Sequence, residues 1–304
     1  MTTIVRAGGP FSPAVDFGLL AKLPGRWVGK GFNLIARPNR QGDPTNPVFF
    51  LELNATQETL EFFPIGGDIP NRGDSEKDAE LHAMNYLQVV TDCVQMTMIH
   101  KEPGFWLHVP TTAEGGESYV RQAVIPHGDS LLAQSTFFTT VKGGPILNPV
   151  NTLPFPQADP IPALNADPAH PKGGPYIDPY VKGVLPDDCM PKGLDAAKTI
   201  KDPTEVLRAA IVGQTIASTD VIQISTVPPG GIVNIPFVVK NANAVQMDAI
   251  FWIETVAKDP DVNLDNEDDD PKSMFFQLQY VQRVILDFDN VHWPHVSVAT
   301  LIKE

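Results

Sequence analysis

The feature that most constrains the fold is a long succession of short strand patterns with almost no helix between them. The strand-like segments are rich in β-branched and aromatic residues, and turn residues such as Pro64-Ile-Gly-Gly67 and Gly115-Gly116 separate several of them. Consecutive strands without helical crossovers pair antiparallel, and a barrel or a sandwich suits this many of them. We expect an all-β, antiparallel up-and-down β-barrel. The expected strands are 49–54, 59–63, 84–90, 94–99, 105–109, 119–125, 221–226, 232–239, 249–255, 275–286 and 296–302.

Few helices are expected. Asp202-Pro203-Thr204-Glu205 combines an N-cap, a first-turn proline and a glutamate at the third helical position, which predicts a capping box. Leu207, Ala210 and Ile211 then form an apolar stripe, and Gly213 ends the helix. A second short helix over 17–22 is expected to close the base of the barrel.

A proline-rich segment covers residues 145–191. Proline recurs there every few residues, which excludes regular helix and central strand. Apolar residues such as Phe155, Leu164 and Tyr180 are spaced through it, so we expect an ordered insertion packed on a single barrel domain, 1–304. Two roles for the insertion stay open, a lid over the barrel and a contact between subunits of a homo-oligomer.

Composition excludes several classes of partner. The net charge is −14, and there is no cluster of Lys and Arg, which argues against binding to nucleic acid or to an anionic membrane. No apolar run reaches membrane-spanning length or forms a signal peptide. The two cysteines, Cys93 and Cys189, fit no zinc spacing, and we expect two reduced thiols in a cytoplasmic protein rather than one disulfide.

The C-terminal segment 291–304 is a strand pattern that begins with a histidine. Alternation places Ser297, Ala299 and Leu301 on the face of His295. An imidazole on a face of small and apolar residues needs a hydrogen-bond partner or a metal. The alternative is a hydrated histidine at the start of the strand.

Three motifs in order carry a family resemblance. They are Gly25-x-Trp27 with Gly29-x-Gly31, then His100-x-Glu102-x-Gly104-Phe105-Trp106, and finally His295-Val-Ser-Val-Ala-Thr-Leu301. Together they resemble the nitrobindin family, relatives of the lipocalin and fatty-acid-binding barrels that hold haem b in an apolar cup.

The resemblance implies a haem b-binding barrel with His295 as the metal ligand through Nε2. It further implies that His100, Met98 and Trp27 line or support the cofactor pocket. Chemistry with nitric oxide or peroxynitrite, or a weak peroxidase-like activity, would follow from it. On the residues alone, Met98 also suits an ordinary core, and Trp27 suits the barrel floor.

Two other functions stay open. One is a metal-free carrier of a small apolar ligand such as a fatty acid. The other is an enzyme acting on an apolar substrate in the same cavity, with His100 or His295 as acid or base. The acidic run 259–270 has the alternating oxygen ligands of a calcium loop but Leu264 in place of the required glycine, which favours a solvated hairpin loop.

Overall fold

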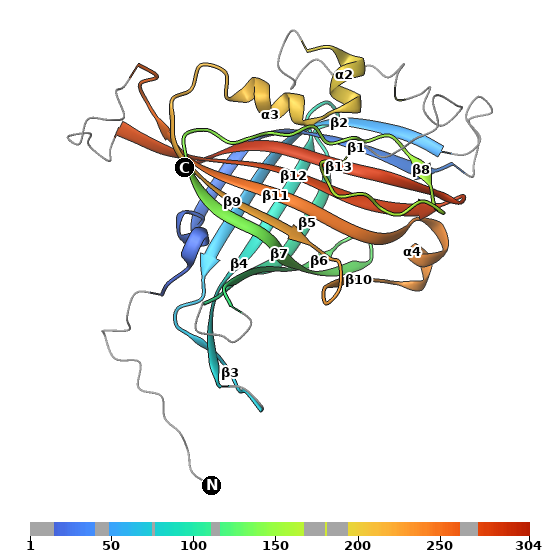
Figure 1. Cartoon of the computed structure of the whole chain (residues 1–304). Helices are drawn as coiled ribbons and strands as arrows, with labels where there is room; N and C mark the ends of the chain where they lie inside the picture. The colour runs from blue at the N-terminus through green and yellow to red at the C-terminus, as the bar shows by residue number, and fades with distance from the viewer. Residues whose placement is uncertain are drawn as a thin grey trace.

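The computed structural model describes residues 15–39, 49–74, 77–110, 116–166, 180, 194–261 and 273–304 (Figure 1). Strands that follow one another along the chain are neighbours in one sheet, in the order β1-β2-β4-β5-β6-β7-β9-β11-β12-β13. β13 also pairs with β1, which closes the sheet into a barrel of ten antiparallel strands. The expected all-β up-and-down barrel is therefore confirmed.

The barrel strands are long, and three minor strands attach to them: β3 to β4, β8 to β13 and β10 to β7. The barrel strands are β1 (Gly25–Pro38), β2 (Phe49–Pro64), β4 (Ala79–Asp92), β5 (Met98–Val109), β6 (Ser118–Ile125), β7 (Asp129–Lys142), β9 (Ile216–Ser225), β11 (Asn243–Ala257), β12 (Met274–Phe288) and β13 (Val291–Lys303). The other elements are the 3₁₀ helix η1 (Gly18–Lys22), β3 (Ile69–Asn71), β8 (Phe155–Pro156), α2 (Ala196–Lys201), α3 (Thr204–Ala210), β10 (Gly231–Asn234) and α4 (Pro236–Asn241).

Two glycines permit the closure between β1 and β13. Gly29 lies opposite Leu301, and Gly31 lies opposite Ala299. A Cβ atom on Gly29 would overlap the carbonyl oxygen of Thr300, and one on Gly31 would overlap that of Val298. Glycine inside a strand often marks a place where another backbone comes close, and here the approaching backbone is the last strand of the barrel.

The interior of the barrel is filled only at one end. Because successive strand residues alternate between the two faces, one residue in two points inward. Leu20 and Leu23, which lie in and just after η1, join Trp27, Trp106 and Leu301 in a buried cluster that fills this end. The short helix expected over 17–22 is thus present as η1, at the base of the barrel (Figure 1).

A second apolar layer covers part of the outer wall. The chain leaves the barrel after β7, runs through β8, α2 and α3, and returns as β9 (Figure 1). Leu147, Leu164 and Leu207 from this excursion belong to one buried cluster with the outward-facing Val296 and Val298 of β13.

A buried ion pair also holds the excursion to the wall. Arg283 donates to Asp248 at 2.8 Å and to the carbonyl of Pro162 at 2.7 Å. Residues 167–179 and 181–193 lie outside the described part of the chain. Three expectations therefore stay predictions: the limits of the insertion at 145–191, the single domain, and the role of the insertion as a lid or a subunit contact.

Several expected elements differ in their limits. The segments 49–54 and 59–63 form one continuous strand, β2, because the polar residues between them continue the alternation. Residues 94–97 form a turn in which Met96 has φ 54°, so the expected strand at 94–99 begins only at Met98. The segment 232–239 is divided between β10 and α4 because Pro236 begins the helix. The strand β7 was not expected.

The expected helix at 202–213 is shorter and capped differently. α3 spans Thr204–Ala210, and Asp202 accepts from the Thr204 hydroxyl at 2.5 Å. Glu205 does not complete a capping box; it pairs with Lys198 and Arg208. The local motif predicted the start of the helix, but Glu205 forms ion pairs with Lys198 and Arg208 instead of the expected capping contact.

The expectation that Cys93 is a reduced thiol is wrong, since Cys93 is disulfide-bonded. Cys189 lies outside the described residues. Disulfides persist in oxidising compartments, and the cytoplasmic location stays a prediction that this bond does not favour.

Two further expectations concern loops and membranes. Residues 262–272 lie outside the described part of the chain, so the reading of the acidic run as a solvated loop rather than a calcium site stays a prediction. None of the described helices is long and apolar enough to cross a bilayer.

The close approach of β1 to β13 generates a test. We expect Gly29→Ala to lower the free energy of unfolding by about 1–3 kcal/mol, because the added methyl group must push the two strands apart. Gly66→Ala is the control, since no atom lies within 4 Å of a Cβ there, and its effect should stay within about 0.5 kcal/mol. Urea denaturation of both variants measures the difference, and equal effects would contradict this role of Gly29.

Candidate functional site

A cavity of about 270 Å³ lies in the barrel at the end away from η1. The residues that line it come from the end of β1 and the beginnings of β5 and β13, whereas the filled interior lies at the opposite ends of these strands. Among the sixteen lining residues only Ile35, Val90 and Ile99 are aliphatic, and all the others are polar or charged. The molecule therefore has an apolar base and a polar open end.

Strand register brings the polar side chains of the cavity together. Glu58 on β2 lies opposite Val90 on β4, which lies opposite His100 on β5. Residues in one row of an antiparallel sheet point to the same face, so all three side chains enter the cavity. In the next row, Gln88 on β4 lies opposite Glu102 on β5. Two carboxyl groups and one imidazole thus share a wall although they lie on strands far apart in sequence.

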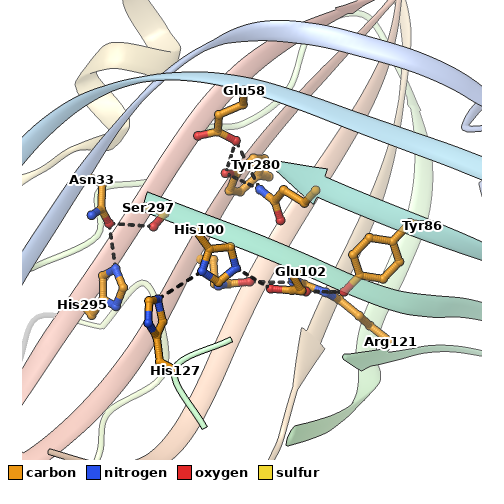
Figure 2. A network of polar contacts seen from close by, with 12 residues as sticks. Asn33, Glu58, Tyr86, His100, Glu102, Arg121, His127, Tyr280, His295 and Ser297 are labelled. Carbon is orange, nitrogen blue, oxygen red and sulfur yellow. Dashed lines mark hydrogen bonds and ion pairs between the residues drawn. The ribbon is translucent and has the colours of Figure 1, made fainter. Parts of the chain in front are cut away.

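The first of these carboxyl groups, Glu102, belongs to a buried charge network (Figure 2). Its Oε1 accepts from Arg121 Nη2 at 2.5 Å and from the Tyr86 hydroxyl, and Arg121 Nε donates to the same hydroxyl at 2.9 Å. Burial alone would raise the pKa of Glu102, but the Arg121 guanidinium and the neighbouring His100 lower it to about 2. Glu102 is therefore ionised and neutralised by Arg121.

The second carboxyl group, Glu58, is held by neutral hydrogen-bond donors. Its oxygens accept from the Thr56 hydroxyl at 3.0 Å, from the Tyr280 hydroxyl at 2.6 Å and from Gln88 at 3.2 Å. Burial raises the pKa of Glu58 although each of these hydrogen bonds lowers it. Glu58 therefore retains its proton to a higher pH than an exposed glutamate.

Small residues allow Tyr280 to reach Glu58. Tyr280 lies on β12 and Glu58 on β2, with β13 and β1 between them. In the row of Tyr280, β13 presents Ala299 and β1 presents Gly31, while Glu58 lies two residues along, opposite Gly29. These small residues leave room for the phenol ring to lie across both strands. The glycine motif thus has a second effect, since it leaves room for the side chain that bonds Glu58.

His295 lies on the cavity wall, as its face of the final strand predicted. Its Nε2 is 2.7 Å from Oδ1 of Asn33, and the Ser297 hydroxyl donates to the same oxygen at 3.0 Å. Because Oδ1 is an acceptor, Nε2 carries the proton and Nδ1 keeps the lone pair. Burial, and then His100 and His127, lower the pKa of His295 to about 3, so the imidazole is neutral at physiological pH.

A third histidine completes the mouth of the cavity. His127 lies in the turn between β6 and β7 and faces His100, with Nδ1 of His100 3.4 Å from Nε2 of His127. Nε2 of His100 is 3.1 Å from Glu102. Figure 2 shows the imidazoles of His100, His127 and His295 gathered at this end of the polar network.

The other two residues predicted for the cofactor pocket lie elsewhere. Trp27 is fully buried in the filled end of the barrel, where its indole N–H donates to the carbonyl of Leu23 at 2.7 Å. Met98 lies at the rim and is 61% exposed, and a register shift between Val90 and Thr91 breaks the alternation between Met98 and His100. Neither lines the cavity. Of the four predicted pocket residues, the structure brings together His100 and His295.

Sequence reasoning did not assign site roles to Glu58, Arg121, His127 and Tyr280. For Arg121 a usable signal was present, because it shares a strand face with Tyr119 and Ala123, and a charge on an apolar face needs a buried partner. No comparable signal marks His127, whose role depends on where the turn that carries it lies.

Comparisons with known proteins show no family for this chain. No protein-family model and no curated protein matches this chain. Among solved structures, the crystal structure of Rv2717c from M. tuberculosis is similar with a TM-score of 0.42 and 12% identity over 94% of each chain. A likeness this distant carries no inference about function.

The Glu102–Arg121 pair generates a test of the site. We expect Arg121→Met to lower the free energy of unfolding by about 3–5 kcal/mol, because it leaves a buried carboxylate without its cation. Adding Glu102→Gln to that variant should restore most of the loss, since no charge is then buried. Chemical denaturation of the single and double variants measures this, and additive losses would show that the two residues are not coupled.

Proposed function

We propose that the protein binds one small polar molecule in the open end of its barrel. The observation that carries the proposal is a cavity of about 270 Å³, lined mostly by residues with polar or charged side chains, in a barrel whose other end is filled by apolar side chains. An interior that served only as a core would be filled by side chains, whereas Glu58, His100 and His295 surround an open space.

The size of the cavity limits the ligand. The cavity volume is about 270 Å³. Pockets for drug-sized molecules span about 300–1,000 Å³, so the ligand is smaller than most of these. A fatty acid suits the walls poorly, because its chain would lie against carboxyl, amide and imidazole groups and desolvate them.

General acid–base catalysis on such a molecule is a second candidate function. The observation that favours it is the pair of opposite pKa shifts in one cavity: the pKa of Glu58 is raised, and that of His295 is lowered to about 3. Glu58 would donate a proton as general acid. Because its lowered pKa makes His295 a weak base, the lone pair of Nδ1 would accept a hydrogen bond and orient the molecule without taking the proton.

Haem binding through His295 stays a prediction of the nitrobindin resemblance. As the cavity residues are arranged, they do not fit a haem held by Nε2 of His295, because that nitrogen is engaged by Asn33. A porphyrin also needs apolar contacts, and only three of the lining residues are aliphatic. We therefore assign no step to a haem.

Binding of a polar molecule can be tested by filling the cavity. We expect a thermal-shift screen of amines, amino acids, sugars and nucleosides to yield compounds that raise the Tm of the wild-type protein. Ser297→Leu places a larger side chain in the cavity and should abolish the shift, whereas Ser130→Leu, at an exposed position of β7, should keep it. Compounds that stabilise both variants equally would show binding elsewhere, and stabilisation by long-chain fatty acids alone would favour an apolar carrier.

The haem hypothesis has a separate spectroscopic test. The resemblance predicts that titration with haemin gives a Soret band in the wild-type protein that His295→Ala loses while its circular dichroism spectrum is unchanged. Identical spectra of the two proteins would reject ligation by His295.

A further inference from the structure

We propose that His100 and His127 form a binding site for a divalent transition-metal ion such as Zn²⁺ at the mouth of the barrel. The site goes beyond the binding of a polar molecule and does not depend on it. Its two protein ligands are Nδ1 of His100 and Nε2 of His127, and water or a ligand atom in the cavity fills the other positions.

The separation of the two nitrogens is the first argument. They lie 3.4 Å apart, beyond the usual range of a hydrogen bond, about 2.7–3.2 Å. Zn–N bonds of about 2.0–2.1 Å in a tetrahedral site place two imidazole nitrogens about 3.3–3.4 Å apart. The observed distance therefore suits a shared metal ion better than a shared proton.

The second argument is the set of groups behind His100. The other ring nitrogen of His100, Nε2, lies 3.1 Å from Oε2 of Glu102, whose second oxygen is held by Arg121 and Tyr86. A carboxylate at Nε2 fixes the proton there and leaves the lone pair of Nδ1 directed at His127. A carboxylate behind a histidine is the usual outer support of a metal-ligating imidazole.

The turn that carries His127 is held in place by its neighbours. Gly128 has φ +111°, and its carbonyl accepts from the N–H of Ile235 at 2.9 Å. A side chain at Gly128 would overlap Ile235, so the turn lies tightly against the start of α4. His127 itself remains exposed at the rim, where an ion from solvent can reach it.

A second pair of histidines, His82 and His108, serves as a comparison because its ring nitrogens are all engaged by other groups. The rings of His82 and His108 are 5.9 Å apart, close to the 5.4 Å between His100 and His127. Both Nδ1 atoms of that pair contact the carbonyl of Asp16, and both Nε2 atoms face carboxylates, Asp68 and Glu117. No ring nitrogen of that pair is left for a metal.

The number of protein ligands limits the affinity. Within the described ranges, no group of three or more His, Cys, Asp or Glu residues is arranged to hold a metal ion. The site has two imidazoles, and imidazole suits Zn²⁺, Cu²⁺ and Ni²⁺ better than Mg²⁺ or Ca²⁺. We therefore expect weaker binding than in closed structural zinc sites, together with free coordination positions that face the cavity.

Calorimetric titration of untagged, chelator-treated protein with Zn²⁺ tests the site. We expect one ion per chain, and a loss of affinity of at least about tenfold in both His127→Ala and His127→Gln. His82→Ala is the matched control and should bind Zn²⁺ as the wild-type protein does. Co²⁺ should give visible absorption bands that the His127 variants lose.

The outcomes are distinct from those of the ligand screen, because no organic molecule is present. Absence of Zn²⁺ binding would overturn the metal site and leave the binding of a polar molecule untouched. Equal affinities of the wild-type protein and folded His127 variants would also overturn it. A loss confined to His82→Ala would move the ion to the other histidine pair.

Discussion

Closure of the sheet between β1 and β13 is the constraint from which the rest of the structure follows. An open sheet of this length would expose two edges and would have no interior. The closing pair runs from Trp27 opposite Lys303 to Leu34 opposite Val296. This register places His295, Ser297 and Leu301 of β13 inside the barrel. A slip of the pairing by one residue would turn these three side chains outward.

The barrel keeps its two ends chemically separate. Trp27, Trp106 and Leu301 help to fill one end. The other end holds two buried carboxyl groups, Glu58 and Glu102, whose surroundings have opposite effects on their pKa. Glu102 is neutralised by Arg121 and supports His100, while Glu58 is surrounded by neutral donors and has a raised pKa. One cavity wall therefore carries both a fixed charge and a group able to exchange a proton.

A second buried apolar cluster, on the outer face of the barrel, adds to the core while one end of the interior is lined by polar residues. The polar cavity buries few apolar side chains. On the outer face of β13, Leu147, Leu164 and Leu207 pack on Val296 and Val298 and bury the apolar surface there. The final strand is thus apolar on its covered outer face and carries His295 on its inner face. This arrangement explains why a strand with so many apolar residues can present an imidazole to a cavity.

Local sequence determined much of the fold. Alternating and β-branched segments predicted most strands, turn residues separated them, and Asp202-Pro203 marked the start of a helix. The sequence patterns predicted the wrong structure at 94–97, where Met96 adopts the left-handed region and the chain turns. They also did so at 232–239, where Pro236 begins a helix inside a strand-like pattern. The face of His295 was also fixed by alternation alone, since only the parity of the strand enters.

Tertiary structure decided which groups meet. Whether the interior at His295 is open, and whether its walls are apolar, depends on side chains from strands across the whole chain. Arg121 reaches Glu102, and Tyr280 reaches Glu58, only because of the register and curvature of the closed sheet. His127 faces His100 because a turn is held against α4. Such contacts depend on distances in space between residues remote in sequence, and periodicity along one strand does not contain them.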